Sequence, residues 1–95
     1  MSVFEEQQKK RFQFLSYVYE STEANTEKHI YLRDITKGTG LSESEVVSIA
    51  NYLLNEKGFI LCDTLLGLSH DVGIVWISTK GITEVEAKIQ SFEDD

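Results

Sequence analysis

Few side chains of this 95-residue chain have the types and spacing that catalysis or metal binding requires. Cys62-Asp63 and His70-Asp71 could face one another across a hairpin, as a thiolate–imidazole pair or a metal site would need. One cysteine and two histidines, however, give no recognisable ligand spacing. The sequence also lacks a Gly-rich phosphate loop and a nucleophile elbow. We therefore expect no catalytic residue, no metal and no cofactor.

A row of polar side chains is better suited to recognising another macromolecule. Helical geometry places it on the outward side of a helix predicted over residues 42–56. The row consists of Ser44, Ser48, Asn51 and Asn55, with Tyr52 beside it. Asn can read adenine through two hydrogen bonds, and Ser can contact bases or phosphate. The alternative is that these are ordinary solvent-facing residues of an amphipathic helix.

The charges near this row argue against DNA as its partner. The formal net charge is −7, from sixteen acidic and nine basic residues, whereas DNA-binding proteins usually present a basic surface to the phosphates. Lys57 is the single Lys or Arg in residues 38–79. The same stretch contains Glu43, Glu45, Glu56, Asp63 and Asp71.

Positive charge is concentrated elsewhere in the chain. Three cations stand together at residues 9–11, and Arg33 and Lys37 share one face of a short predicted helix. Arg33, Lys37 and Lys57 are our candidates for phosphate contacts. The alternative is that Arg33 and Lys37 are only solvated surface charges.

The segment of residues 65–71 carries three leucines. Exposed apolar side chains on a loop are typical of a protein contact. Leu66, Leu68 and His70 are therefore candidate contact residues. The alternative is that one or two of the leucines fold back onto Trp76 and complete the core.

Apolar spacing and turn residues predict the elements that position these side chains. We expect helices over residues 3–23, 33–38 and 42–56, a last helix starting at Ser78 or Thr79, and β-segments over 29–32, 59–62 and 74–77. Gly40 favours the left-handed end of the second helix. Ser42 and Glu45 have the spacing of a capping box that opens the third.

Aromatic residues suggest a contact between two copies of the chain. The first helix should bury one stripe, formed by Phe4, Phe12, Leu15, Val18 and Tyr19. Phe14 lies at the edge of this stripe and Tyr17 on the far side, while Phe92 ends the stripe of the last helix. Because exposed aromatics are enriched at protein interfaces, these three residues are candidate dimer contacts.

The order and punctuation of the elements resemble the winged-helix superfamily, in particular small prokaryotic regulators of the MarR and PadR types. The matching segments are Leu32-Arg33-Asp34-Ile35, Thr39-Gly40-Leu41-Ser42, Leu53-Leu54, Gly58-Phe59-Ile60 and Ile77-Ser78-Thr79-Lys80-Gly81. The resemblance implies a mostly helical α+β fold, a helix-turn-helix with a two- to three-stranded wing and a C-terminal helix. It also implies that the polar row enters the DNA major groove.

Two functional hypotheses follow for this predicted single domain of residues 1–95. The resemblance favours a transcription regulator that binds DNA as a homodimer. The charges and the leucines favour a protein–protein interaction module on the same scaffold, which does not bind DNA. The sequence contains no apolar run of the length of a membrane span, and its single cysteine fits a reducing, cytoplasmic location.

Overall fold

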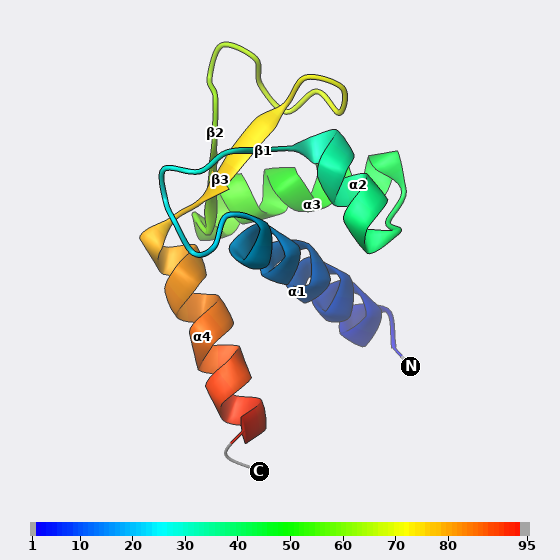
Figure 1. Cartoon of the computed structure of the whole chain (residues 1–95). Helices are drawn as coiled ribbons and strands as arrows, with labels where there is room; N and C mark the ends of the chain where they lie inside the picture. The colour runs from blue at the N-terminus through cyan, green and yellow to red at the C-terminus, as the bar shows by residue number, and fades with distance from the viewer. Residues whose placement is uncertain (1, 94–95) are drawn as a thin grey trace.

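The structure is a computed structural model that describes the backbone of residues 2–93 and the side chains of residues 2–91. It is an α+β fold in which helices predominate around a three-stranded antiparallel sheet (Figure 1). In chain order the elements are α1 (Val3–Ser21), β1 (Ile30–Tyr31), α2 (Leu32–Thr39), α3 (Glu43–Tyr52), the π-helical turn η1 (Leu53–Lys57), β2 (Ile60–Cys62), β3 (Ile74–Ile77) and α4 (Thr79–Glu93). The predicted α+β, mostly helical class is confirmed.

Local signals set the limits of α1. The Ser2 hydroxyl caps its start by accepting a hydrogen bond from the Glu5 amide at 3.2 Å. The helix ends at Ser21, slightly earlier than predicted, because Glu23 and Ala24 adopt positive φ angles of 55° and 56°. These two residues turn the chain toward β1.

The predicted capping box at the start of α3 is confirmed. The Glu45 amide donates to the Ser42 hydroxyl at 3.2 Å, and the Ser42 amide donates to the Glu45 carboxylate at 3.0 Å. Gly40, with φ of 76°, ends α2 just before it. The α-helix was predicted to run to residue 56, but it gives way at Leu53 to η1, which ends at Gly58 with φ of 67°.

The strands lie in the order β1-β3-β2. Ile60 pairs with Ile77, and both are fully buried on the inner face of the sheet. Leu61 pairs with Trp76 on the opposite, more exposed face. This alternation is the period-2 pattern of a sheet that covers a core on one side.

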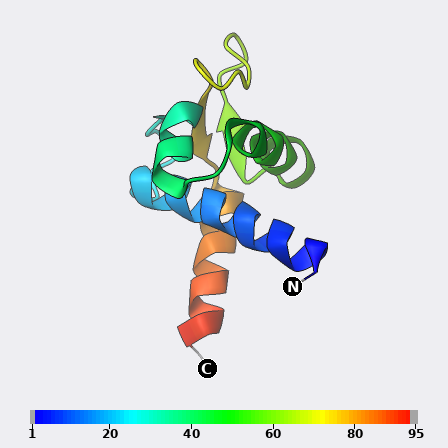
Figure 2. The ribbon, with the colours of Figure 1, turned by 90° about the vertical axis from the view of Figure 1, so that its right-hand side faces the viewer.

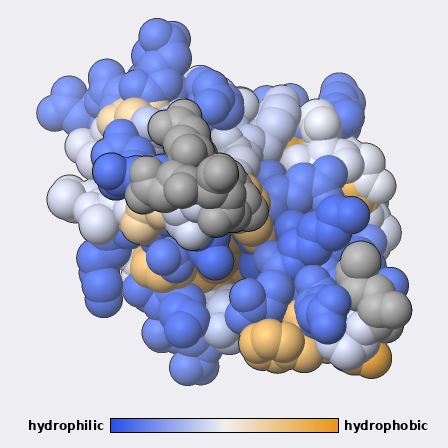
Figure 3. Space-filling view, turned by 90° about the horizontal axis from the view of Figure 1, so that it is seen from below, coloured by the Kyte–Doolittle hydropathy of each residue, from blue (hydrophilic) through white to orange (hydrophobic). Residues whose placement is uncertain are grey.

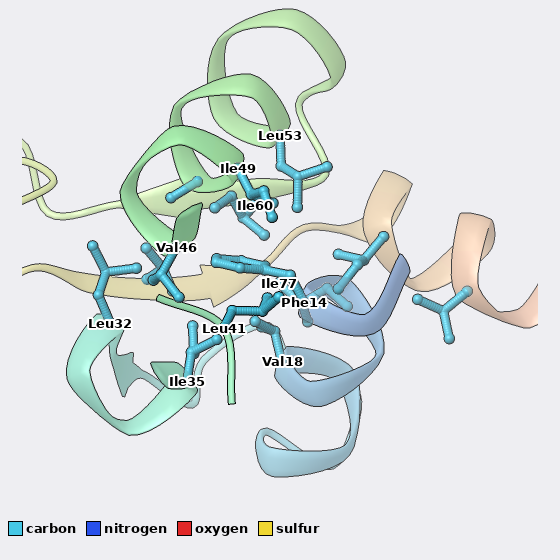
Figure 4. Packing of buried hydrophobic residues seen from close by; sticks show 14 residues of the cluster. Phe14, Val18, Leu32, Ile35, Leu41, Val46, Ile49, Leu53, Ile60 and Ile77 are labelled. Carbon is cyan, nitrogen blue, oxygen red and sulfur yellow. The ribbon is translucent and has the colours of Figure 1, made fainter. Parts of the chain in front are cut away.

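The core lies between α1, α2, α3 and the inner face of the sheet, with Val85 contributed by α4 (Figure 4). Its fully buried side chains include Phe14, Val18, Leu32, Ile35, Val46, Ala50, Ile60, Val75, Ile77 and Val85. Two predictions for α1 are wrong. Phe14 is 0% exposed instead of lying at the edge of the buried stripe, and Phe4 is 68% exposed instead of buried. Phe4 is in the first turn of α1, which extends beyond the core (Figure 1).

α4 packs against α1, with contacts that reach as far as Lys88, and its last turns extend away from the body (Figures 1 and 2). Gly81 is buried where α4 begins, and a Cβ atom there would overlap the carbonyl oxygen of Phe59. Glycine therefore allows the helix to approach the backbone next to β2. The start of α1 and the end of α4 lie on the side of the body away from the loop between β2 and β3 (Figure 1).

Candidate recognition surface

The polar row lies on the outward side of α3, as predicted. Ser44, Ser48 and Asn51 are exposed, and the Asn51 side chain donates a hydrogen bond to the Val47 carbonyl at 3.0 Å. Asn55 is also exposed, but it belongs to η1, whose wider turn takes it out of α-helical phase with the other three. The row presents hydroxyl and amide groups to the solvent and carries no charge of its own.

A cation of α1 reaches the start of α3. Lys10 Nζ lies 2.5 Å from Glu45 Oε2. The hydrogen bond from Lys10, together with the bonds to Ser42, lowers the pKa of Glu45 to about 2. The same carboxylate raises the pKa of Lys10. Glu45 is thus neutralised by a residue from the basic cluster of α1.

Tyr52 is half-buried at the end of the row and lies between two cations. The Arg11 guanidinium carbon is 3.8 Å from the centre of the Tyr52 ring, and Lys57 Nζ is 6.0 Å from it. These distances are typical of cation–π contacts. The phenol ring is therefore covered by Arg11 and is not a free base-stacking surface.

The loop of residues 63–73 between β2 and β3 has a defined conformation. The Asp63 carboxylate accepts a hydrogen bond from the Leu65 amide at 2.8 Å, and the Asp63 carbonyl accepts one from the Gly67 amide at 2.9 Å. Gly67 adopts φ of 67°, which favours glycine. Gly73 is buried and donates to the Ser69 carbonyl at 2.6 Å.

Contacts to α2 hold this loop in place. Arg33 Nη1 donates to the Asp71 carbonyl at 2.9 Å, and His70 Nε2 lies 2.7 Å from the Thr36 hydroxyl. Arg33, a predicted phosphate contact, therefore links α2 to the loop. Lys37, the second predicted contact on α2, is exposed.

The leucines of the loop do not behave alike. Leu65 is 94% exposed and Leu66 is 43% exposed. Leu68 is half-buried and packs against the core, as the alternative interpretation proposed for one or two of the leucines, but Trp76, on which they were expected to fold, is not part of that core. His70, also half-buried, faces α2. The exposed apolar tip therefore consists of Leu65 and Leu66, and Leu65 was missing from the predicted contact residues.

The predicted dimer residues are not the exposed aromatics that we expected. Phe14 is buried in the core, so it cannot contact a second copy. Tyr17 is half-buried, and its ring lies so close to Gly38 of α2 that a Cβ atom there would overlap it. The side chain of Phe92 lies outside the described residues. Among the side chains that the structure describes, the large exposed apolar residues near the start of α1 and the end of α4 are instead Val3, Phe4 and Ile89.

Comparison with known proteins assigns no family and no function to this chain. No family model, no curated protein and no solved structure matches the chain. Among the described residues, no three His, Cys, Asp or Glu side chains are grouped so that they could hold a metal ion. Within the same part of the chain, no helix combines the length and apolar character of a membrane span.

Proposed function

We propose that this chain is a winged-helix module that binds a protein partner through the tip of the β2–β3 loop. The observation that carries the proposal is Leu65, an apolar side chain 94% exposed on a loop that is fixed at both ends. Because hydrogen bonds already hold this loop, docking costs little further conformational entropy. A leucine presented in this way suits insertion into a pocket of a partner.

The charges around the tip indicate the chemistry of that partner. Asp71 is exposed and Asp63 half-exposed within the loop, and Glu43 is exposed at the start of α3. Complementary charge increases the rate and specificity of association. We therefore propose a protein surface with an apolar pocket for Leu65 and a rim of Lys or Arg side chains.

The test is affinity capture followed by direct binding measurements on the captured protein. Leu65→Ser with Leu66→Ser should abolish binding and leave the melting temperature unchanged, because neither residue belongs to the core. Leu61→Ser is the control, since Leu61 lies on the sheet outside the loop and is 45% exposed, close to the 43% of Leu66. A partner that binds the double variant as tightly as the wild type would contradict the proposal.

A second candidate function, a homodimeric transcription regulator that binds DNA, is favoured by one observation. Lys10 of α1 reaches α3, and Arg11 covers Tyr52 at its end. These cations partly offset the acidic residues that the sequence places around the polar row. Because few cations lie near the row, the affinity for DNA should fall only slightly as the salt concentration rises. The logarithm of the binding constant changes with the logarithm of the salt concentration with a slope of about −0.9 per phosphate neutralised.

A gel-shift titration at about 50 mM salt, where screening is weak, separates the two functions. Retardation that is lost with Lys37→Glu and Lys57→Glu would support the regulator. Asn51→Ala should then reduce sequence preference and leave the salt slope unchanged, because Asn51 neutralises no phosphate. Absence of retardation with genomic fragments would leave the protein-binding function.

In either proposal the chain forms a homodimer, but the contact residues differ from the aromatic residues expected from the sequence. Val3 and Phe4 at the start of α1 are 75% and 68% exposed, and Ile89 on α4 is 37% exposed. Seen from the side of the chain ends, the surface is mostly hydrophilic with separate apolar areas (Figure 3). A second copy packed along α1 and α4 would cover these side chains.

A further inference from the structure

A small pocket lies apart from the loop, between α1, the end of α3 with η1, and α4. Its volume is about 130 Å³. The lining residues include Arg11, Phe12, Lys57, Phe59, Glu84 and Lys88. They come from three separate stretches of the chain, residues 8–15, 52–59 and 84–88, so only the fold brings them together.

Three of the nine basic residues of the chain meet at this pocket. Arg11, Lys57 and Lys88 come from α1, η1 and α4, and none of them forms a salt bridge within the part of the chain that the structure describes. This is notable in a chain with sixteen acidic residues, where carboxylates are abundant. Glu84 is the one carboxylate among the described lining residues. The pocket therefore carries an excess of positive charge.

Aromatic rings lie beside these cations. Arg11 and Lys57 are placed over Tyr52, and Lys88 Nζ lies 5.8 Å from the centre of the Phe12 ring. Phe59 and the buried Leu15 complete the apolar part of the lining. The site thus combines three cations with the half-buried ring of Phe59, which none of these three cations covers and which can pack against one flat apolar group.

We infer that this pocket binds a small phosphate monoester that carries a single flat apolar group. Three cations and one carboxylate leave an excess of two positive charges, which matches a phosphate monoester better than a monovalent carboxylate. A monoester carries about −1.5 to −2 charge at neutral pH. Arg11 can offer a planar pair of N–H donors to the phosphate oxygens. The volume suits one ring, since pockets for drug-sized ligands measure about 300–1,000 Å³.

Isothermal titration calorimetry with phenyl phosphate at about pH 7.5, above the second phosphate pKa of about 6, tests this inference. We expect saturable binding with one site per chain. Lys88→Gln should weaken it by about ten-fold or more, the effect of losing one charged hydrogen-bond donor. Lys37→Gln, which removes an exposed cation of α2 outside the pocket, should leave the affinity unchanged.

Two further ligands test separately whether the apolar group and the double negative charge contribute to binding. Inorganic phosphate should bind more weakly than phenyl phosphate, because it lacks the apolar body, and benzoate should bind more weakly, because it carries one charge. Equal affinity of all three, or equal losses for Lys88→Gln and Lys37→Gln, would show general ionic attraction and overturn the inference. The inference would also be overturned if phenyl phosphate did not bind while duplex DNA bound and Lys88→Gln weakened the binding of that DNA. The outcome is independent of the protein-binding proposal, since Leu65 does not line the pocket.

Discussion

Glu45 has two roles at the start of α3. One carboxylate oxygen accepts from the Ser42 amide and completes the capping box, while the other accepts from Lys10 of α1. The residue therefore joins the local signal that starts a helix to a tertiary contact between two helices. Its low pKa, about 2, reflects both sets of bonds.

This low pKa makes a prediction about acid stability. The folded pKa of Glu45 lies below the ordinary value of 4.5, so its ionised form contributes stability that is complete above about pH 4.5 and is lost as the pH falls toward about 2. Glu45→Gln should therefore lower the melting temperature at neutral pH. The gap between wild type and variant should narrow across that acidic range in circular dichroism melts. A gap that stays constant over this range would contradict the assigned cause.

The cap itself gives a second prediction. Ser42→Ala removes the hydroxyl that accepts from the Glu45 amide, and losing such a cap typically costs about 0.5–2 kcal/mol of the free energy of unfolding. Urea denaturation should show this loss. Ser44→Ala is the matched control, because Ser44 is exposed two residues further on and makes no capping bond. Equal loss in both variants would mean that the cap contributes nothing specific.

At the scale of residues, sequence reasoning succeeded where the cause was local. The capping box needed only the spacing of Ser42 and Glu45. It failed for Phe4 because helical periodicity gives the direction of a side chain but not which turn of the helix has a neighbour. It failed for Phe14 because periodicity does not give how wide a face of the helix the other elements cover. It also missed Leu65, since nothing in a run of leucines tells which one stays exposed.

At the scale of elements, the close approach of α4 to β2 depends on one glycine. Gly81→Ala places a methyl group against the carbonyl of Phe59. Because a backbone atom cannot move aside easily, we expect a loss of about 1–3 kcal/mol in the free energy of unfolding, the range for overpacked sites. Gln90→Ala, an exposed position of the same helix, should change it little. Thermal or urea unfolding of both variants measures the difference.

The elements themselves were largely predictable, because glycines and caps mark most of their ends. The π-helical turn was not. Residues 42–56 have the apolar spacing of an α-helix throughout, whereas in the structure the α-helix gives way at Leu53 and the Leu53 carbonyl accepts a hydrogen bond from the Phe59 amide at 2.9 Å. The tie between Arg33 and the loop was also hidden, because it joins a side chain to a distant backbone carbonyl.

At the scale of the whole molecule, we predict a homodimer through α1 and α4. Light scattering should give about twice the 10.8 kDa mass of the chain at micromolar concentration. Phe4→Glu with Ile89→Glu should yield monomers without loss of helicity, since both side chains are exposed. Val72→Glu, an exposed apolar position of the loop, should remain dimeric. A wild-type chain that stays monomeric at high concentration would contradict the prediction.

Contacts between distant segments were the part that the sequence could not provide. Lys10 with Glu45, Arg11 with Tyr52, and Lys88 with Phe12 each join residues far apart in the chain. Composition gave the total charge, but only the fold shows that three cations share one pocket. The order of charges along the chain therefore predicted the acidic character of the loop, but it did not predict the positive charge of the surface between α1, α3 and α4.

The loop and the exposed ends of α1 and α4 lie on opposite sides of the molecule (Figure 1). A dimer joined at these helix ends would therefore hold its two leucine tips facing apart. Such an assembly is bivalent and can bridge two partners or two sites on a repetitive one. When both tips engage one scaffold, the second binding event becomes intramolecular, and avidity can exceed the single-site affinity by about 10²–10⁴. A partner whose pocket binds a single leucine only weakly would then still hold the dimer.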